Sequence, residues 1–374
     1  MPDKTFTILE TDPHSAARTG LLATAHGTVE TPVFCPVGTA GTVKGITPQQ
    51  LLETRTEMIL ANIYHLLLRP GIDVIEKIGG LHTFMGWPKP IITDSGGYQI
   101  LSLSPLVKIR SGGVEFSSHV DGQKILLTAE TAVKIQNRLG ADIVMCLDQC
   151  TPFPCPDAQM QKAVETTLRW AAACKKAHAN PQRLLFGIVQ GGVNPQLRRL
   201  CATELVKLDF DGYAIGGLCV GEGHENMIKT VGLVNEILPQ ERVRYLMGAG
   251  TPADIIAAVA AGVDIFDCVL PTRNGRNAFA FTEKGPLRLR NSLHIQSTQP
   301  VEDGCDCYCC RNFTRAAIRH FFNCGEMLGP ILLSVHNISF YQRLMAQVRQ
   351  NIQKKRFSQW AREKMSMYFN HEAG

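Results

Sequence analysis

The sequence predicts an α/β protein built on a (β/α)8 barrel, the TIM-barrel architecture. Short apolar runs alternate with helical patterns eight times over about 240 residues. Most of these runs are continuously apolar, which is typical of parallel strands buried on both faces. Eight such alternations over this length match a (β/α)8 barrel in number and size.

The expected strands follow one another at the spacing that such a barrel needs. They cover residues 31–38, 57–62, 91–96, 141–148, 184–191, 212–217, 243–250 and 264–272. Helical patterns follow the fourth, fifth and sixth strands, over residues 156–179, 194–208 and 225–238. Between the third and fourth strands, the glycines and alternating residues of SGGVEFSSHVDGQ (111–123) predict a small hairpin insertion.

A doubly wound sheet is the competing interpretation of the same pattern. Its support is GAGTPA at Gly248–Ala253, which fits a dinucleotide-binding glycine motif after a strand. That strand is the seventh, however, whereas the motif belongs after the first. In a barrel the loops after the seventh and eighth strands commonly bind phosphate, so the glycines fit there too, and we prefer the barrel.

Composition restricts the class of protein further. The chain has 374 residues, 45% of them hydrophobic and 19% charged, so a disordered chain is excluded. The longest apolar run, at 255–263, is far shorter than the ~20 residues of a membrane span. The start, MPDKTFTILETDPH, is too polar for a secretory signal, and 13 cysteines are an odd number. We therefore expect a cytoplasmic protein with no membrane partner and no disulfide framework.

The charge is distributed unevenly along the chain. Residues 1–268 carry 23 Lys and Arg against 26 Asp and Glu, a net charge of −3, whereas residues 269–374 carry 15 against 7, a net charge of +8. A basic segment of this kind favours a polyanion, and in a cytosolic protein that polyanion is most commonly RNA. The charge run alone favours equally an alternative, in which KKRFSQWAREK is only the solvated surface of a helix.

Polar residues fall at the carboxyl ends of the expected strands. In a barrel these ends share one rim, so distant residues converge on one pocket. A single acid there is often only a helix N-cap, but three acids and an amide are harder to explain in that way. Such groups can act as nucleophile, acid, base or hydrogen-bond acceptor, which suggests displacement at a sugar carbon or recognition of a heterocycle. They are Asp94, Asp148, Gln190, the Gly216–Gly217 pair and Asp267.

A cysteine cluster predicts a metal centre in the basic segment. Cys305, Cys307, Cys309 and Cys310 lie within six residues, at the spacing of metal ligands. The fourth ligand must come from farther along the chain, where the candidates are His320, Cys324 and His336. Such a set forms a closed structural zinc site, with an iron–sulfur cluster as the minor alternative, and Cys309 is expected to be spare.

Longer motifs give the chain a family resemblance that extends from about residue 27 to the C-terminal helices. The chain resembles the tRNA-guanine transglycosylases, whose fold is a TIM barrel with a zinc-bearing subdomain. The resemblance implies a single catalytic unit over residues 1–374, with a barrel core at about 27–272 and a basic zinc-binding subdomain with closing helices at about 273–374. The motifs are TDSGGYQ (93–99), DQCTPFP (148–154), GIVQGG (187–192), GYAIGGLCVGE (212–222), RYLMGAG (244–250), FDCVLPTRNGRN (266–277), CDCYCC (305–310) and VHNISFYQRLM (335–345).

The resemblance implies a base exchange in RNA. Guanine at the wobble position of tRNAs with GUN anticodons, those for Asp, Asn, His and Tyr, is replaced by a 7-deazaguanine in queuosine biosynthesis. Asp267 corresponds to the nucleophile that attacks the ribose anomeric carbon, and Asp94 to the general acid/base. A carboxylate can trap an oxocarbenium-like centre as a covalent intermediate, and two displacements retain the β configuration.

The remaining site residues also follow from the resemblance. Asp148 would accept hydrogen bonds from the base, Gln190 and the Gly217 N–H would meet its carbonyl oxygen, and the Leu218 carbonyl would meet an aminomethyl group. Tyr98 and Met247 resemble the pair of side chains that stacks on the two faces of the base, although a Tyr at a strand end and a Met in a strand usually belong to the hydrophobic core. Glu222 resembles the residue that orients the Leu218 peptide. The full base-binding set is Ser95, Gly97, Tyr98, Asp148, Gln190, Gly217, Leu218, Glu222 and Met247. The RNA-binding set is Gly248, Gly250, Thr251, Asp254, Thr272, Arg273 and Arg276. The zinc ligands correspond to Cys305, Cys307, Cys310 and His336.

The expected partners are tRNA, a free base and a second copy of the chain, with one structural zinc ion and no organic cofactor.

Bacterial relatives often carry Glu where this chain has Gln149, so the pocket wall is altered there. Cys150 and Val220 resemble the bacterial form, which takes 7-aminomethyl-7-deazaguanine, and queuine is the alternative substrate. Two other hypotheses compete: a small-molecule nucleosidase leaves the basic zinc-bearing quarter unexplained, and a noncatalytic RNA-binding zinc protein leaves the rim carboxylates unexplained.

Overall fold

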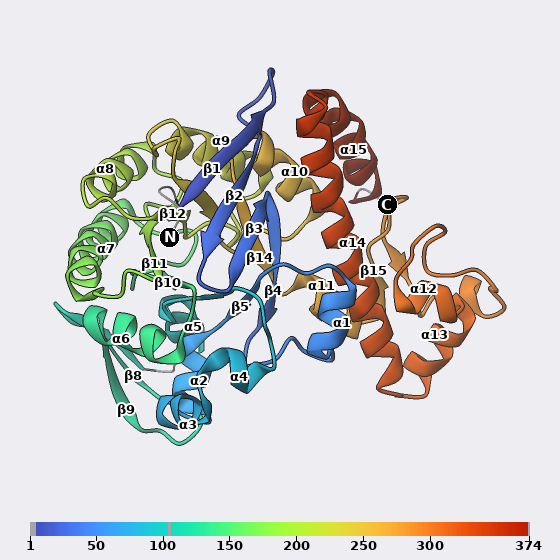
Figure 1. Cartoon of the computed structure of the whole chain (residues 1–374), viewed down its shortest axis with the longest axis horizontal. Coiled ribbons are helices and arrows are strands. Elements are labelled where there is room, and N and C mark those ends of the chain that lie inside the picture. The colour runs from blue at the N-terminus through green and yellow to red at the C-terminus, as the bar shows by residue number, and fades with distance from the viewer. Residues whose placement is uncertain (1–4, 104–105, 373–374) are drawn as a thin grey trace.

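A closed barrel of eight parallel strands forms the centre of the protein. The computed structural model describes residues 5–103 and 106–372. Because β14 pairs with β4 and closes the sheet, the doubly wound alternative is wrong and the barrel prediction is confirmed (Figure 1). Each strand lies inside its expected range. In chain order they are β4 (Val33–Gly38), β5 (Ile59–Ala61), β6 (Ile91–Thr93), β10 (Ile143–Met145), β11 (Leu184–Val189), β12 (Gly212–Ile215), β13 (Val243–Leu246) and β14 (Ile265–Cys268).

Helices surround the barrel (Figure 1), and their apolar side chains form a buried core cluster with it. The three helical patterns expected from the sequence are present as α7 (Asp157–Ala177), α8 (Pro195–Val206) and α9 (His224–Asn235). The other helices that follow the strands or connect them are α1 (Pro48–Glu53), α2 (Ile63–Leu68), α3 (Ile72–Ile78), α4 (Leu81–Met85), α5 (Gly97–Leu103), α6 (Ala129–Leu139), α10 (Pro252–Ala260) and α11 (Leu270–Arg276).

An antiparallel sheet, which the sequence did not predict, covers the amino-terminal end of the barrel. It consists of β1 (Phe6–Thr11), β2 (Arg18–Thr24) and β3 (Gly27–Thr31), so the first barrel strand begins only at Val33. Phe6, Leu22 and Val29 join the apolar cluster inside the barrel. This sheet therefore covers the end of the barrel opposite the rim.

A buried carboxylate ties this sheet to the barrel. One Asp142 oxygen accepts the backbone N–H of His26 at 3.0 Å and pairs with the His26 ring at 2.8 Å. The other oxygen accepts the Ile91 N–H at 2.9 Å and lies 3.1 Å from His82 Nε2. These three side chains have the composition of a metal site. Both Asp142 oxygens already have at least two partners each. We therefore interpret this cluster as a structural contact between the sheet and the barrel.

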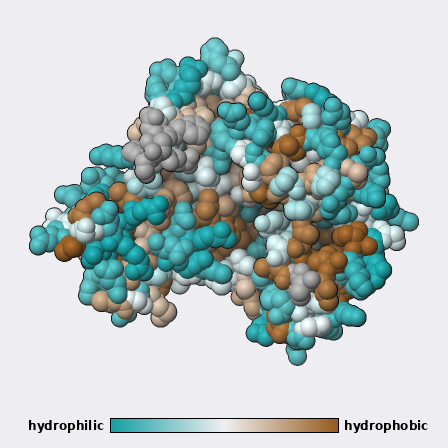
Figure 2. Space-filling view, turned by 180° about the vertical axis from the view of Figure 1, so that it is seen from behind, coloured by the Kyte–Doolittle hydropathy of each residue, from teal (hydrophilic) through white to brown (hydrophobic). Residues whose placement is uncertain are grey.

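The insertion between β6 and β10 is larger than the expected hairpin. It is a three-stranded antiparallel sheet of β7 (Val107–Ile109), β8 (Gly113–Ser117) and β9 (Lys124–Thr128). Leu101 and Leu103 of α5, Leu106 ahead of β7, and Leu126 of β9 are exposed. Figure 2 shows hydrophobic surface gathered on this side of the molecule, at the lower right of the view. Since α5 begins at the rim, the mouth of the barrel borders an apolar surface.

The C-terminal quarter forms a subdomain and then returns to the barrel. The subdomain contains β15 (Phe279–Ala280), β16 (Leu287–Arg288), α12 (Tyr308–Asn312) and α13 (Arg315–Asn323) around its own small core. The long helix α14 (Leu328–Gln353) then packs across α11 and β4, where Gln342 donates to the Phe34 carbonyl at 3.1 Å, and α15 (Phe357–Glu372) follows. None of the described helices has the length and apolarity to cross a bilayer.

Candidate active site and metal centre

The rim of the barrel brings together polar side chains that are far apart in the sequence. Ser95, just after β6, donates to Asp148 Oδ1 at 3.1 Å, and Gln190, just after β11, donates to Asp148 Oδ2 at 2.6 Å. On the next strands, the Tyr245 hydroxyl of β13 donates to Asp267 Oδ1 of β14 at 2.6 Å. Parallel strands end at one rim, so these contacts form one polar site at the open end of the barrel.

Asp94 is a buried acid with a raised pKa. The pKa of Asp94 is raised to about 6, mainly because the carboxyl group is buried. Hydrogen bonds from the Asn62 amide and the Ile63 N–H lower this pKa, and the charge of Asp267 raises it. The side chain is only 6% exposed. A carboxyl group with a pKa close to neutral exchanges protons readily at physiological pH, as an acid/base catalyst must.

Asp267 has different surroundings. Its Oδ1 atom accepts hydrogen bonds from the Tyr245 hydroxyl and, at 3.0 Å, from the Gly248 N–H. Burial raises the pKa of Asp267, and these two hydrogen bonds oppose that shift. Within the described residues no hydrogen bond engages Oδ2, so one oxygen is held while the other is available for attack on a substrate.

Asp148 and Gln190 form a row of hydrogen-bonding groups beside the two acids. Burial raises the pKa of Asp148. The Gln190 side chain is completely buried, and its Oε1 atom has no partner among the described residues. Gly97 and Gly217 keep this row accessible: a Cβ on Gly97 would lie 2.8 Å from the Asp148 carbonyl oxygen, and one on Gly217 would lie 2.3 Å from Gln190 Oε1. The Gly217 φ of +64° also favours glycine.

The segment after β12 is held by Glu222. Its two carboxylate oxygens accept the backbone N–H groups of Cys219 at 2.5 Å and Val220 at 2.9 Å. Leu218, just before them, is buried. Tyr98 is 53% exposed, whereas Met247 is partly buried against the core inside the barrel. The base-binding residues expected from the sequence therefore follow β6, β10, β11, β12 and β13, with Gly97 and Tyr98 in the first turn of α5 and the others on loops.

The expected RNA-binding residues lie beside this rim, after β13 and β14. Gly248 is exposed and Gly250 is buried. Thr251 caps α10 by accepting the Asp254 N–H, and the Asp254 carboxylate contacts His224 at 2.6 Å. In α11, Arg273 is exposed, Arg276 is half-buried, and the Thr272 hydroxyl donates to the Val269 carbonyl at 3.3 Å. Burial, and then the neighbouring charge of Arg273, lower the pKa of Arg276.

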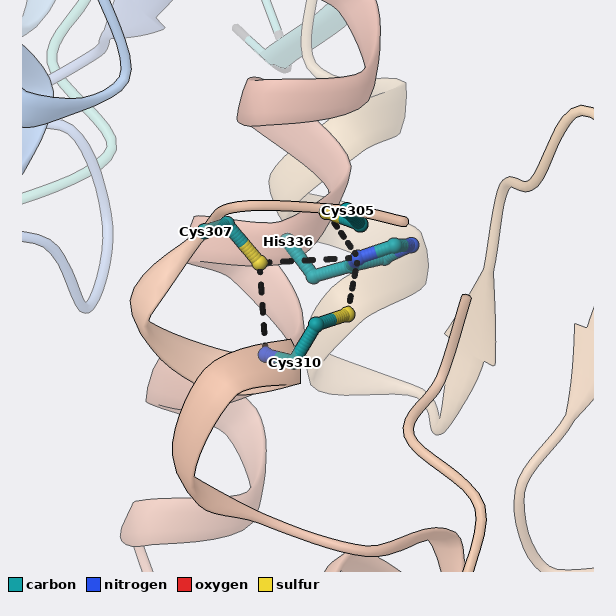
Figure 3. A group of neighbouring side chains, drawn as sticks. All are labelled: Cys305, Cys307, Cys310 and His336. Carbon is teal, nitrogen blue, oxygen red and sulfur yellow. Dashed lines mark hydrogen bonds between the residues drawn. The ribbon is translucent and has the colours of Figure 1, made fainter. Parts of the chain in front are cut away.

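Three cysteines and one histidine converge in the subdomain, as Figure 3 shows. His336 Nδ1 lies 3.7 Å from the sulfurs of Cys305 and Cys307 and 3.3 Å from that of Cys310. Bonds of ~2.3 Å to sulfur and ~2.0 Å to nitrogen place tetrahedral ligand atoms ~3.5 Å apart, so this cluster can hold a metal ion. His336 Nε2 lies 2.8 Å from the Phe281 carbonyl, which leaves Nδ1 free to bind metal.

The cluster selects one of the three candidates for the fourth ligand. His320 and Cys324 contact each other instead, with Sγ 3.6 Å from Nδ1, and lie outside the four-residue group. Cys309 is buried in the subdomain core and is not one of the four, as expected for the spare cysteine. Arg343 donates to Cys305 Sγ at 2.8 Å, so this cation would face the excess negative charge of three thiolates if the cluster held a divalent ion.

Three polar residues of the site were not singled out by the sequence patterns. Asn62 ends the strand at 57–62, so the strand-end criterion used for the other rim residues could have found it. Tyr245 lies within an apolar run, so the sequence pattern predicts a core residue there. Arg198 lies in a helix among polar neighbours and reads as a surface charge, yet it is completely buried.

The fold and the site together define an α/β-barrel enzyme whose rim carries acids and amides and whose C-terminal subdomain carries a candidate metal centre. A family model described as queuine tRNA-ribosyltransferase matches residues 12–370. The chain belongs to this family of tRNA-modifying transferases, which are the tRNA-guanine transglycosylases expected from the motifs.

Individual relatives agree with this assignment. A queuine tRNA-ribosyltransferase of Thiobacillus denitrificans is 52% identical over 355 residues, which cover 95% of this chain and 96% of the relative. Relatives of the same name from a Thermoanaerobacter species and from Thermus thermophilus are each 48% identical. The match to the Thermoanaerobacter relative covers 97% of this chain and 97% of that relative. The match to the Thermus thermophilus relative covers 95% of this chain and 92% of that relative.

Proposed function

We propose that this protein replaces the wobble guanine of tRNAs with GUN anticodons, those for Asp, Asn, His and Tyr, with a 7-deazaguanine, in queuosine biosynthesis. The observation that carries the proposal is the pair of rim acids in unequal surroundings. Asp267 has one oxygen held and one available, and Asp94 has a pKa of about 6. Asp148, Gln190 and Gly217 lie beside them as groups that can read a guanine-type base.

In the first displacement, Asp267 attacks the anomeric carbon of the ribose. A bond forms between a carboxylate oxygen and that carbon, and the bond from the carbon to guanine breaks. Asp94 gives its proton to the departing base, which leaves as neutral guanine. The product is a covalent glycosyl-enzyme intermediate in which the RNA backbone is intact.

In the second displacement, the same two acids act in reverse. Asp94, now a carboxylate, takes the proton from the ring nitrogen of the incoming 7-deazaguanine. That nitrogen attacks the anomeric carbon and releases Asp267. Two inversions at one carbon retain the β configuration of the nucleoside.

The pocket supports a small incoming base. Cys150 Sγ lies 3.3 Å from Asp148 Oδ2, beside the group that would bind the base, and the Val220 N–H is held by its hydrogen bond to Glu222. We therefore favour 7-aminomethyl-7-deazaguanine over queuine, whose cyclopentenyl substituent needs more room. The ratio of the kcat/KM values for the two bases measures this choice.

The RNA would bind beside the rim, and the metal would bind in the C-terminal subdomain. Thr251 and Asp254, at the start of α10, and Arg273 and Arg276, in α11, would meet nucleotides on either side of a flipped guanosine. The Cys305, Cys307, Cys310 and His336 set would hold one zinc ion, which supplies structural stability to the subdomain when bound.

Two wider properties accompany the proposal. An enzyme of tRNA modification without a described membrane helix is expected to act in the cytoplasm. We also expect a homodimer, because the subdomain exposes large apolar side chains, including Tyr308 at 45%, Leu328 at 38% and Met327 at 79%. Sedimentation analysis tests the dimer.

An exchange assay tests the function. The protein is incubated with radiolabelled guanine and with an unmodified tRNA that carries a GUN anticodon, and the label in the tRNA is counted. We expect incorporation with the wild type and none with Asp267→Asn, which keeps the shape of the side chain but removes the nucleophile. No incorporation by the wild type would contradict the proposal. Release of guanine from free guanosine would instead favour a small-molecule nucleosidase.

A further inference from the structure

Arg198 is a buried cation that the mechanism above does not use. It lies near the start of α8 and is completely buried. It forms no ion pair with any described residue, and its four hydrogen bonds all go to backbone carbonyl oxygens. Burial lowers the pKa of Arg198 to about 10, so the group stays charged at neutral pH. The Glu222 charge acts on Arg198 without forming an ion pair, so the cost of burying the guanidinium is only partly offset and calls for a functional explanation.

The carbonyl groups that Arg198 binds belong to two loops of the base pocket. Nη1 donates to the Val189 carbonyl at 2.6 Å and Nε to the Gly192 carbonyl at 2.7 Å, on either side of Gln190. Nη2 donates to the Gly216 carbonyl at 2.8 Å, on the loop after β12. One rigid guanidinium therefore joins the loop after β11 to the loop after β12.

The contact with Gly216 acts on a single peptide group. The Gly216 carbonyl and the Gly217 N–H are the two ends of one planar amide. Arg198 binds the carbonyl end, and the N–H end is the donor expected to meet the carbonyl oxygen of the base. Hydrogen bonding to a cation polarises an amide and makes its N–H a stronger donor. The peptide plane between two glycines also turns easily about the flanking ψ and φ bonds, and the guanidinium fixes its direction.

We infer that Arg198 is a positioning residue that orients and polarises the Gly216–Gly217 amide, so that its N–H binds the 6-carbonyl oxygen of the guanine-type base. This inference rests on the function proposed above and deepens it. During departure of guanine, negative charge accumulates on the purine, including its carbonyl oxygen. The polarised N–H then holds that oxygen more strongly than an unassisted amide does.

The test compares two free bases that differ at the carbonyl. Guanine carries the 6-carbonyl oxygen, and 2-aminopurine lacks it. Their dissociation constants are measured by isothermal titration calorimetry on the wild type, Arg198→Met and Arg199→Met. Arg199 is the matched control, because it neighbours Arg198 on the same helix but is exposed and pairs with Glu236 at 3.6 Å.

We expect the preference for guanine over 2-aminopurine to fall about tenfold to a hundredfold in Arg198→Met, with the 2-aminopurine constant changed less than about threefold. Arg199→Met should keep the wild-type preference. The two bases also differ in protonation at N1, but this difference is the same for every variant and cancels in the comparison.

Two results would overturn the inference. Equal weakening of both bases in Arg198→Met would show a merely structural role, and an unchanged preference would show no role at all. If Arg198→Met does not fold, Arg198→Lys is measured instead. It keeps the charge but cannot bind three carbonyls in one plane, so the preference should fall several-fold, and an unchanged preference again overturns the inference. A wild type that binds no guanine contradicts the proposed function itself, which is a separate outcome.

Discussion

Replacing Asp94 with asparagine should stabilise the folded protein while it abolishes catalysis. The folded state raises the pKa of Asp94 from 3.8 to about 6, so the fold prefers the protonated carboxyl group. Asn62 can rotate its amide to present its oxygen to the new side chain. The variant is neutral at every pH and therefore avoids the cost of burying a charge.

The size of this effect follows from the pKa shift. The folded state binds more protons than the unfolded state between the two pKa values, so the wild type loses stability as the pH rises through this window and reaches its full loss above about 6. Raising the pKa from 3.8 to about 6 costs about 3 kcal/mol at pH 8 and about half of that at pH 5, where the unfolded state is ionised but the folded state is not. The advantage of Asp94→Asn should therefore fall by about half between pH 8 and pH 5.

Urea titrations at both pH values measure the free energy of unfolding. Asp142→Asn is the contrasting control. Burial opposes ionisation of Asp142, but the close His82 ring and the hydrogen bonds from Ile91 and His26 outweigh it and hold its pKa below the usual value. That variant should be less stable than the wild type, with the deficit largest above the usual pKa of Asp. A free-energy difference for Asp94→Asn that is the same at pH 5 and pH 8, or that favours the wild type, would refute the reasoning.

Three further outcomes follow from the site. Cys307→Ala should lose the metal and destabilise the subdomain, and elemental analysis that still finds one ion per chain would show that the ligand assignment is wrong. Arg276→Ala should raise the KM for tRNA more than the KM for the free base, and equal changes would count against its assigned role. Gly217→Ala should weaken base binding at least about tenfold, because the added Cβ meets Gln190 Oε1 and the positive φ disfavours alanine, and normal guanine binding would contradict this.

Much of the barrel is predictable from local pattern. Strands such as Leu184–Val189 are buried along their whole length in the parallel sheet, so they appear in the sequence as unbroken apolar runs. The residue at which such a run turns polar marks the rim. Asp94, Asp148 and Gln190 are visible for that reason, because each follows a run directly.

Other features lack such a signal. The strand Phe6–Thr11 is mostly exposed or half-buried, so its pattern does not differ from that of a polar loop. The short strand Val107–Ile109 turned the expected hairpin into a three-stranded sheet, and three residues are too few to show an alternation. The choice of His336 over His320 and Cys324 depended on the family resemblance until the packing of α14 brought His336 to the cysteines.

The sequence by itself determined the order of the strands, the acids at their ends, the cysteine cluster and the family, because these depend on spacing along the chain. Only the tertiary structure decided the chemical state of the groups. The pKa of Asp94 depends on burial and on Asp267, which lies 173 residues farther along the chain. Arg198 lies at the rim only because two segments of the chain fold their carbonyl groups around it. Desolvation and hydrogen bonding act through space, so no spacing along the chain can reveal them.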